Sequence, residues 1–207
     1  PSTFTSIRLE GDQDRGEYQN TQHTKMNVSH PDRETHLAFI QDRDPILITQ
    51  RNQPNGLDQG NTFIAGAGND LITGTPMNDT VKAGSGDDEV YGGEGDDQIF
   101  GGKGDDKLDG GGGDDKIFGI KGNDTLYGCR GDDKLNGGKG ADIYKISPGN
   151  DVFCGLKIAE GDIILIGSST IYSIETFKKH SVIEHDGGST LVKKVSTSDL
   201  ENVIRIV

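Results

Sequence analysis

The sequence predicts an all-β protein: a right-handed parallel β-roll (β-helix) of about five coils, with a C-terminal β-rich cap and an N-terminal flanking segment. Three observations predict this fold. From Ala65 to Cys154 the chain divides into ten nine-residue blocks without an insertion. The sixth position of every block is Asp, and the eighth is always apolar. Apolar residues make up only 30% of the chain, so a conventional core would be thin.

The blocks share the pattern G-G-x-G-x-D-x-U-x, in which U is apolar and x is variable. They run from "AGAGNDLIT" to "ISPGNDVFC", and "GLDQGNTFI" from Gly56 is a degenerate block ahead of the first. The sixth-position aspartates are Asp70, Asp79, Asp88, Asp97, Asp106, Asp115, Asp124, Asp133, Asp142 and Asp151. We therefore divide the chain into an N-terminal flank or linker with strands (1–55), a repeat region (56–154) and a C-terminal cap (155–207).

Each block is expected to form a minimal strand at positions seven to nine, with the eighth side chain pointing inward. Glycine at the first, second and fourth positions permits turns with positive φ and leaves backbone carbonyls free to face a ligand. Asn or Asp at the fifth position tolerates left-handed backbone. Two blocks make one coil, so blocks two apart in sequence stack on each other.

This stacking places the aspartates in two ladders. Asp88, Asp106, Asp124 and Asp142 form one ladder, and Asp97, Asp115, Asp133 and Asp151 form the other. Like charges about 5 Å apart repel by roughly 0.8 kcal/mol per pair even in bulk water. The ten blocks hold 18 acidic and 9 basic residues, a net charge of −9. We therefore predict that the roll does not close without counterions.

Calcium removes this conflict, because it takes six to eight oxygen ligands from carboxylates and carbonyls. The aspartates of all ten blocks are the candidate side-chain ligands. Candidate carbonyl ligands are Gly66, Gly68, Gly84, Gly86, Gly93, Gly95, Gly102, Gly104, Gly111, Gly113, Gly122, Gly131, Gly138 and Gly140. We expect about six ions and at most eight. The Asp79 block is discounted because Met77 replaces a loop glycine, and the Asp151 block because it opens with "ISP".

These blocks resemble the repeats of the RTX (repeats-in-toxin) family of exported calcium-binding proteins. The resemblance implies a C-terminal module of a larger protein that leaves a Gram-negative bacterium unfolded through the type I secretion apparatus. It also implies a secretion signal within residues 155–207. It implies folding on external calcium and a location outside the cell or on its surface. A toxin, a secreted hydrolase or epimerase and an adhesin all stay open as the parent protein.

Composition alone would favour a Gly- and Asp-rich disordered linker, but the unbroken register of ten blocks argues against that alternative. The disordered linker and the folded roll can also be the same chain at low and at high calcium. Binding sites that are split between coils do not exist in the unfolded chain, so binding and folding are coupled. We expect disorder at cytosolic calcium and folding at extracellular millimolar calcium.

Other function classes have little support. The net charge of −13 argues against nucleic acid as a partner. The longest apolar runs are too short for a transmembrane segment. Neither H-E-x-x-H nor G-x-S-x-G occurs, so we expect no enzyme in these residues and any catalytic domain outside them. Cys129 and Cys154 are too few for a disulfide framework, and whether they pair is left open.

A basic stripe offers an alternative function. Lys103, Lys121 and Lys139 occupy third positions two blocks apart and should stack along one edge. Such a stripe could hold an acidic polysaccharide, as some RTX modules of alginate epimerases are thought to do. The chain would then be a polysaccharide-binding accessory module of a carbohydrate-active enzyme. Solubilising lysines on a solvated face are the simpler alternative.

The flanks lack the repeat. Strands are expected at Gly161–Gly167, Ser189–Val195 and Asn202–Val207, with a short helix around Ile174–Lys179. These elements would cap the open end of the roll. In the N-terminal flank, the apolar segments His36–Ile40 and Pro45–Thr49 are expected to form strands over the other end.

Overall fold

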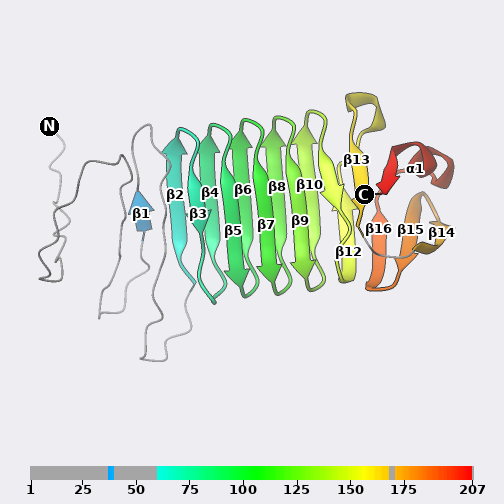
Figure 1. The fold of residues 1–207 in the computed structure, drawn as a ribbon, viewed down its shortest axis with the longest axis horizontal. Helices are drawn as coiled ribbons and strands as arrows, with labels where there is room; N and C mark the ends of the chain where they lie inside the picture. The colour runs from blue at the N-terminus through cyan, green and yellow to red at the C-terminus, as the bar shows by residue number, and fades with distance from the viewer. Residues whose placement is uncertain (1–36, 40–59, 168–170, 207) are drawn as a thin grey trace, which may run out of the picture.

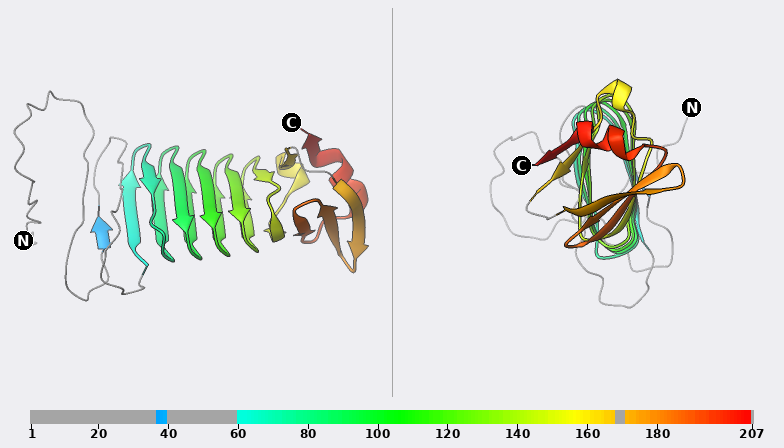
Figure 2. Two further views of the ribbon diagram at one scale, coloured as in Figure 1. Left: turned by 60° about the horizontal axis from the view of Figure 1, so that its bottom comes forward. Right: turned by 90° about the vertical axis from the view of Figure 1, so that its right-hand side faces the viewer.

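A computed structural model describes residues 37–39, 60–167 and 171–206. The repeat region forms a roll in which successive strands alternate between two facing sheets (Figure 1). Viewed along its axis, the roll has a narrow, elongated cross-section, and the C-terminal elements lie across its end (Figure 2). The all-β parallel roll predicted from the sequence is confirmed.

The strands divide between a ten-stranded and a seven-stranded sheet. The ten-stranded sheet contains, in spatial order, β1 (Leu37–Phe39), β2 (Thr62–Ala67), β4 (Thr80–Ser85), β6 (Gln98–Lys103), β8 (Lys116–Lys121), β10 (Lys134–Lys139), β12 (Gly149–Cys154), β16 (Gly188–Val192), β15 (His180–His185) and β14 (Ile171–Phe177). The seven-stranded sheet contains, in spatial order, β17 (Ile204–Ile206), β13 (Ile163–Ile166), β11 (Ile143–Lys145), β9 (Thr125–Arg130), β7 (Lys107–Gly112), β5 (Glu89–Glu94) and β3 (Leu71–Thr73).

The core of the roll is a column of single side chains. Every eighth-position residue is at most 2% exposed, and these residues are Ile72, Val81, Val90, Ile99, Leu108, Ile117, Leu126, Leu135, Tyr144 and Phe153. The first position of the next block also points inward, but it is usually glycine, as in the buried Gly101 of β6. Each strand therefore contributes little more than one apolar side chain to the core.

Most strands in the roll are longer than the sequence analysis expected. The prediction of strands confined to positions seven to nine is wrong, because strands such as β6 continue through position three of the next block. Gly84 and Gly102 are register partners within the sheet, although both have positive φ. Glycine therefore bends the chain without ending the inter-strand hydrogen bonding.

The three glycine positions have different roles. Second and fourth positions have positive φ, as expected, with 120° at Gly84 and 129° at Gly86. First-position glycines do not, so that part of the expectation is wrong. A Cβ on Gly101 would instead lie 2.3 Å from the Asp106 carboxylate, so this position is kept small by its own block's aspartate. No fifth-position residue among those described has positive φ.

The stack is longer than five coils. The degenerate block supplies β2, which pairs in parallel with β4. At the other end, β13 pairs with β11, and β16 pairs with β12. The roll therefore has about six turns, because chain outside the regular blocks continues both sheets.

The cap combines an antiparallel meander, β14–β15–β16, with a 3₁₀-helix η1 (Ile158–Glu160) and an α-helix α1 (Thr197–Val203). The helix expected around Ile174–Lys179 is wrong: the segment up to Phe177 lies in β14 and pairs with β15, and Lys178 and Lys179 form the turn between the two strands. The α-helix begins instead where the Ser196 hydroxyl accepts the Asp199 N–H, a typical N-cap.

The three strands expected in the C-terminal flank are present with other bounds. The strand expected at Gly161–Gly167 spans Ile163–Ile166, the one expected at Ser189–Val195 ends at Val192, and the one expected at Asn202–Val207 begins only at Ile204, after the helix. In the N-terminal flank, a strand was expected within His36–Ile40, and β1 lies there and pairs in parallel with β2. The strand expected at Pro45–Thr49 and nearly all of the flank at 1–55 lie outside the described residues.

Candidate metal centre

The sixth-position aspartates form two ladders, one along each edge of the roll. At these edges the chain turns between the two sheets (Figure 1). In each ladder, the backbone N–H of one aspartate donates to the Oδ1 of the aspartate 18 residues later. The nitrogen–oxygen distance is 2.9 Å from Asp88 to Asp106 and 2.8 Å from Asp97 to Asp115. Blocks two apart therefore stack as the sequence predicted.

The second carboxylate oxygen has no partner in most blocks. Oδ2 is buried and unpaired in Asp70, Asp88, Asp97, Asp106, Asp115, Asp124, Asp133 and Asp142. These side chains are buried, and Asp124 is 0% exposed. Each unsatisfied buried group costs about 1–3 kcal/mol, more if charged. Eight of them together approach the whole stability of a typical domain, about 5–15 kcal/mol.

Backbone carbonyls lie beside the same turns. A Cβ on Gly84 would approach the Gly66 carbonyl oxygen to 2.1 Å, and one on Gly104 would approach the Gly86 oxygen to 2.1 Å. Carbonyls at the second and fourth positions therefore point along the roll toward the next coil. The space in front of them exists only because glycine follows 18 residues later.

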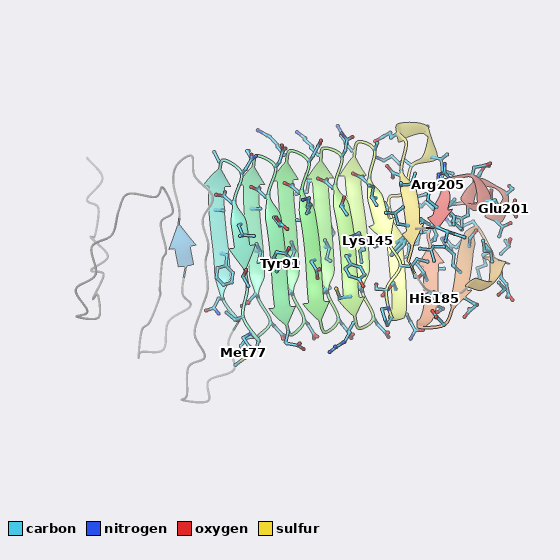
Figure 3. All side chains as sticks on the ribbon, viewed as in Figure 1. Met77, Tyr91, Lys145, His185, Glu201 and Arg205 are labelled. Atoms are coloured by element: carbon cyan, nitrogen blue, oxygen red, sulfur yellow. The ribbon has the colours of Figure 1, made fainter. Side chains whose placement is uncertain are left out.

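Asp79 and Asp151 differ from the other aspartates. The Thr75 N–H and hydroxyl donate to Asp79 Oδ2 at 2.6 and 2.8 Å, and the Ser147 hydroxyl donates to Asp151 Oδ2 at 2.8 Å. In both blocks a hydroxyl residue replaces the second-position glycine. The sequence analysis discounted the same two blocks on other grounds, Met77 (at the lower edge in Figure 3) and "ISP". The hydroxyl at position two is the signal that it missed.

Asp162 is a further ladder member that the sequence analysis did not identify. The Asp142 N–H donates to Asp162 Oδ1 at 2.9 Å, continuing the ladder beyond the last regular block. Asp162 Oδ2 accepts the Lys157 N–H at 2.7 Å and is therefore satisfied. The separation from Asp142 is 20 residues instead of 18, so the nine-residue register hides this residue.

The fifth-position residues form ladders of a second kind, which are exposed. In them each backbone N–H donates to the side chain 18 residues earlier, whereas in the sixth-position ladders it donates to the side chain 18 residues later. The Asp105 N–H donates to Asp87 Oδ1, and the Asn123 N–H donates to Asp105 Oδ1, at 2.9 and 2.7 Å. Asn and Asp are therefore selected at this position as acceptors for the next coil. The sequence analysis had assigned them only a tolerance for left-handed backbone.

Burial raises the pKa of Asp88, Asp97, Asp106 and Asp133, and neighbouring carboxylates add to this effect while backbone N–H donors oppose it. The pKa of Asp97 rises to about 8, and that of Asp106 and Asp133 to about 7. The pKa of Asp88 rises to about 6. Without a cation, the folded roll therefore favours protonated carboxyls in the ladder.

The donor set fits a hard cation. Among the residues that the structure describes, no three His, Cys, Asp or Glu side chains cluster closely enough to hold a metal alone. A cation between two coils would therefore take backbone carbonyls in addition to two carboxylates. A shell of oxygen atoms without nitrogen or sulfur suits calcium and not zinc.

Both cysteines are free thiols. Cys129 occupies a second-position glycine site with φ of 74°, and its thiol donates to Asp109 Oδ1 at 3.0 Å. Burial raises the pKa of the Cys129 thiol to about 12, with the Asp109 carboxylate adding to the effect. This cysteine is consequently a poor nucleophile at neutral pH.

Comparison with known proteins agrees with this geometry. A family model described as the RTX calcium-binding nonapeptide repeat (four copies) matches residues 55–76, 73–108, 91–126, 109–144 and 118–153. No curated protein matches the chain. Among solved structures, the extracellular lipase LipA from Serratia marcescens is similar, with 17% identity and a TM-score of 0.34. The match covers 81% of this chain and 40% of the lipase, so the chain spans well under half of that protein.

Proposed function

Residues 55–153 of this chain are RTX calcium-binding nonapeptide repeats, and from this premise we propose that the roll is a module that folds when it binds calcium outside the cell. The observation that carries the proposal is the set of eight buried Oδ2 atoms without partners. Calcium would give each of these oxygens a partner and would neutralise the ladder at the same time.

The calcium sites lie between successive aspartates of one ladder. Four intervals separate Asp70, Asp88, Asp106, Asp124 and Asp142, and two separate Asp97, Asp115 and Asp133. The module therefore takes about six ions, with the second- and fourth-position carbonyls completing each shell. Asp79 and Asp151 end their ladder without metal, because Thr75 and Ser147 already satisfy them.

Binding and folding are coupled because each site draws ligands from two coils and does not exist in the unfolded chain. About six dications would change the charge of the ten blocks from −9 to about +3. The repeat region stays unfolded at low cytosolic calcium and folds at the millimolar levels found outside cells. This behaviour suits export in unfolded form, through a type I secretion apparatus of a Gram-negative bacterium, as part of a larger toxin, hydrolase or adhesin.

Counting the bound ions tests this assignment. Native mass spectrometry of the full chain in calcium is expected to give about six ions, and the Asp115→Asn variant is expected to give fewer. Asp79→Asn serves as the matched control, because the same substitution there removes no metal ligand. Equal ion counts for the two variants would overturn the assignment of sites.

A second candidate function, binding of an acidic polysaccharide, is favoured by the unequal charge of the two faces. Strands β4, β6, β8 and β10 carry no acidic residue and six lysines, namely Lys82, Lys103, Lys116, Lys121, Lys134 and Lys139. Lys103 and Lys139 are both register partners of Lys121. The Phe100 and Phe118 rings stack between the lysine rows, with centroids 5.2 Å apart.

This face suits a linear polyanion that lies along the roll. Adjacent strands are about 4.8 Å apart, so the lysine rows repeat at that spacing, and the stacked rings offer an apolar surface to sugar rings. The opposite face has mixed charge: it carries Glu89, Glu94 and Asp109, and Tyr91 and Lys145 lie on it in Figure 3.

Retention on immobilised alginate in calcium tests this second function. Replacing Lys103, Lys121 and Lys139 with Glu is expected to abolish retention. The matched control replaces Lys107, Arg130 and Lys145 of the seven-stranded sheet with Glu and is expected to leave retention unchanged. Unchanged retention of the first variant, or equal loss in both, would overturn the function.

A further inference from the structure

Lys157 places a positive charge at the C-terminal end of the Asp70–Asp142 ladder. Its ammonium donates to the Gly138 carbonyl and lies 3.1 Å from the Glu160 carboxylate. Its backbone N–H donates to Asp162 Oδ2 at 2.7 Å. One residue therefore contacts a carbonyl and two carboxylates at the point where the regular repeat stops.

These partners are of the same kind as those of the proposed calcium sites. Gly138 is a second-position residue whose carbonyl belongs to the set that faces the next coil, and Asp142 and Asp162 are successive members of one ladder. The ammonium reaches the Gly138 carbonyl of one coil and the Glu160 carboxylate that precedes Asp162 in the next, so it lies between the two coils.

The other intervals show no such contact among the described residues. Their carboxylates accept hydrogen bonds from backbone N–H groups and from no basic side chain, as Asp106 does from Asp88 and Asp124 does from Asp106. Lys157, by contrast, donates through its ammonium to a second-position carbonyl of the roll.

The two additional residues between Asp142 and Asp162 make this arrangement possible. They allow the 3₁₀-helix η1 to follow Lys157, and Gly161 then closes the turn with φ of 100°. The turn brings the Lys157 stem back over Gly138 while Asp162 keeps its place in the ladder. A regular nine-residue block would have a glycine turn here and an open interval.

We propose that Lys157 is a tethered cation that takes the place of a calcium ion in the interval between Asp142 and Asp162. The last turn of the roll then closes without metal. The coils that need calcium lie on its N-terminal side, and the first of them packs against this turn after it has closed. This inference rests on the calcium function proposed above. It identifies the residue that sets where the row of ions ends.

Removing the ammonium should turn the interval into a calcium site. In Lys157→Met, the Gly138 carbonyl and the carboxylates of Asp142 and Glu160 would remain without a cation, while Asp162 Oδ2 would keep the backbone N–H of residue 157. Those groups are oxygen donors of the kind that calcium takes. The variant should therefore bind one calcium ion more than the unchanged chain, and it should require more calcium to fold, because its last turn no longer closes by itself.

Native mass spectrometry and a calcium titration followed by circular dichroism, both on the full chain, test the inference. Lys157→Met is expected to gain one ion and to fold at higher calcium. Lys157→Arg keeps a positive charge and is expected to keep the original count. Lys107→Met removes an exposed lysine of β7, away from this interval, and is expected to change neither quantity. In Lys157→Met/Glu160→Gln, the gained ion should bind more weakly.

Three outcomes would overturn the inference. Lys157→Met could match the unchanged chain in both ion count and folding midpoint, or Lys157→Arg could gain the same ion. Failure of Lys157→Met to fold at saturating calcium would show that calcium does not take the ammonium's place. If the wild-type chain bound no calcium, the proposed calcium function itself would be refuted. That result is distinguishable from the three outcomes above because it is obtained without any variant.

Discussion

The roll and the cap are built on different principles, although they share both sheets. In the roll, each strand buries about one apolar side chain, and most ladder aspartates have a buried oxygen without a partner. In the cap, a cluster of apolar side chains packs from strands and helix together: Ile164, Ile166, Ile183, Val192, Val195, Leu200 and Val203. Only one buried side-chain atom in the described part of the cap, His185 Nδ1, lacks a partner.

This difference indicates which force holds each region. The cap satisfies its polar groups internally, as Ser181 does by donating to the Val195 carbonyl at 2.8 Å, and it gains stability from burial. The roll leaves its carboxylates for an external cation to satisfy. The cap should therefore be stable with or without calcium, whereas the roll should be stable only when its ladders are neutralised.

The largest expected effect is that of pH on the calcium-free roll, because eight carboxyls act together. Their pKa values in the fold, such as about 7 for Asp124 and about 8 for Asp97, lie above the ordinary value of 3.8. The folded state then binds more protons than the unfolded state, so stability falls as pH rises. In calcium-free buffer, β structure should be greatest near pH 4 and lost between about pH 6 and 8.

Circular dichroism at a series of pH values measures this effect, with calcium-saturated protein as the control. With calcium the trend should reverse, because protons compete with the ion for the same oxygens. Calcium-free β structure that increases from pH 4 to pH 8 would contradict the account of the ladders.

The next effect comes from the core. Leu126→Ala, in the middle of the roll, should lower the free energy of unfolding in calcium by about 2–5 kcal/mol, because Leu126 is 0% exposed. Leu200→Ala in the cap should cost a similar amount. Hydrogen exchange separates the two regions. Leu200→Ala should lower the protection of the cap amides even without calcium, whereas Leu126→Ala should lower the protection of the roll amides only in the presence of calcium.

If Leu126→Ala weakened the roll equally with calcium and with a chelator, the roll would be held by its apolar column. The contrast between the two regions would then be wrong.

A smaller effect distinguishes positions within one ladder. Asp115→Asn removes a ligand shared by two intervals and should raise the calcium concentration needed for folding. Asp79→Asn should leave that concentration nearly unchanged, because Thr75 and not calcium satisfies Asp79. A calcium titration monitored by circular dichroism compares them, and a larger shift for Asp79→Asn would refute the division of the aspartates.

The smallest effect concerns backbone strain. Ile120 stands at a second position with φ of 86°, where six of the ten blocks have glycine. Its side chain is 42% exposed, so Ile120→Gly loses little burial. The substitution should stabilise the calcium-bound roll by about 1 kcal/mol, because left-handed backbone is unfavourable for a β-branched residue. Thermal unfolding in calcium measures this, and a lower melting temperature would contradict it.

Sequence periodicity predicted the features that repeat and missed those that interrupt the repeat. The nine-residue register fixed the inward position of Leu126 and the stacking of Asp106 on Asp88, because both depend only on spacing. Asp162 and Lys157 were missed because two additional residues break that spacing. Whether an aspartate oxygen is satisfied, as by Thr75 or Ser147, depends on contacts that the repeat pattern does not contain.

The cap was predicted less well than the roll. Its apolar segments were recognised, but Ile174–Lys179 was assigned to a helix because an isolated segment of that length does not reveal its pairing partner. The structure shows that Ile174 pairs with Ile183 across a hairpin. Long-range pairing of this kind overrides local preference, and no internal repeat signals it.

The most direct test of the central claim is far-ultraviolet circular dichroism of the full chain during a titration of free calcium, with magnesium as the control. The account predicts a cooperative gain of β signal near millimolar calcium and none with magnesium, which demands a tighter octahedral shell. A full β spectrum that a chelator leaves unchanged at neutral pH would contradict the account, because the roll would then be held together without its ions.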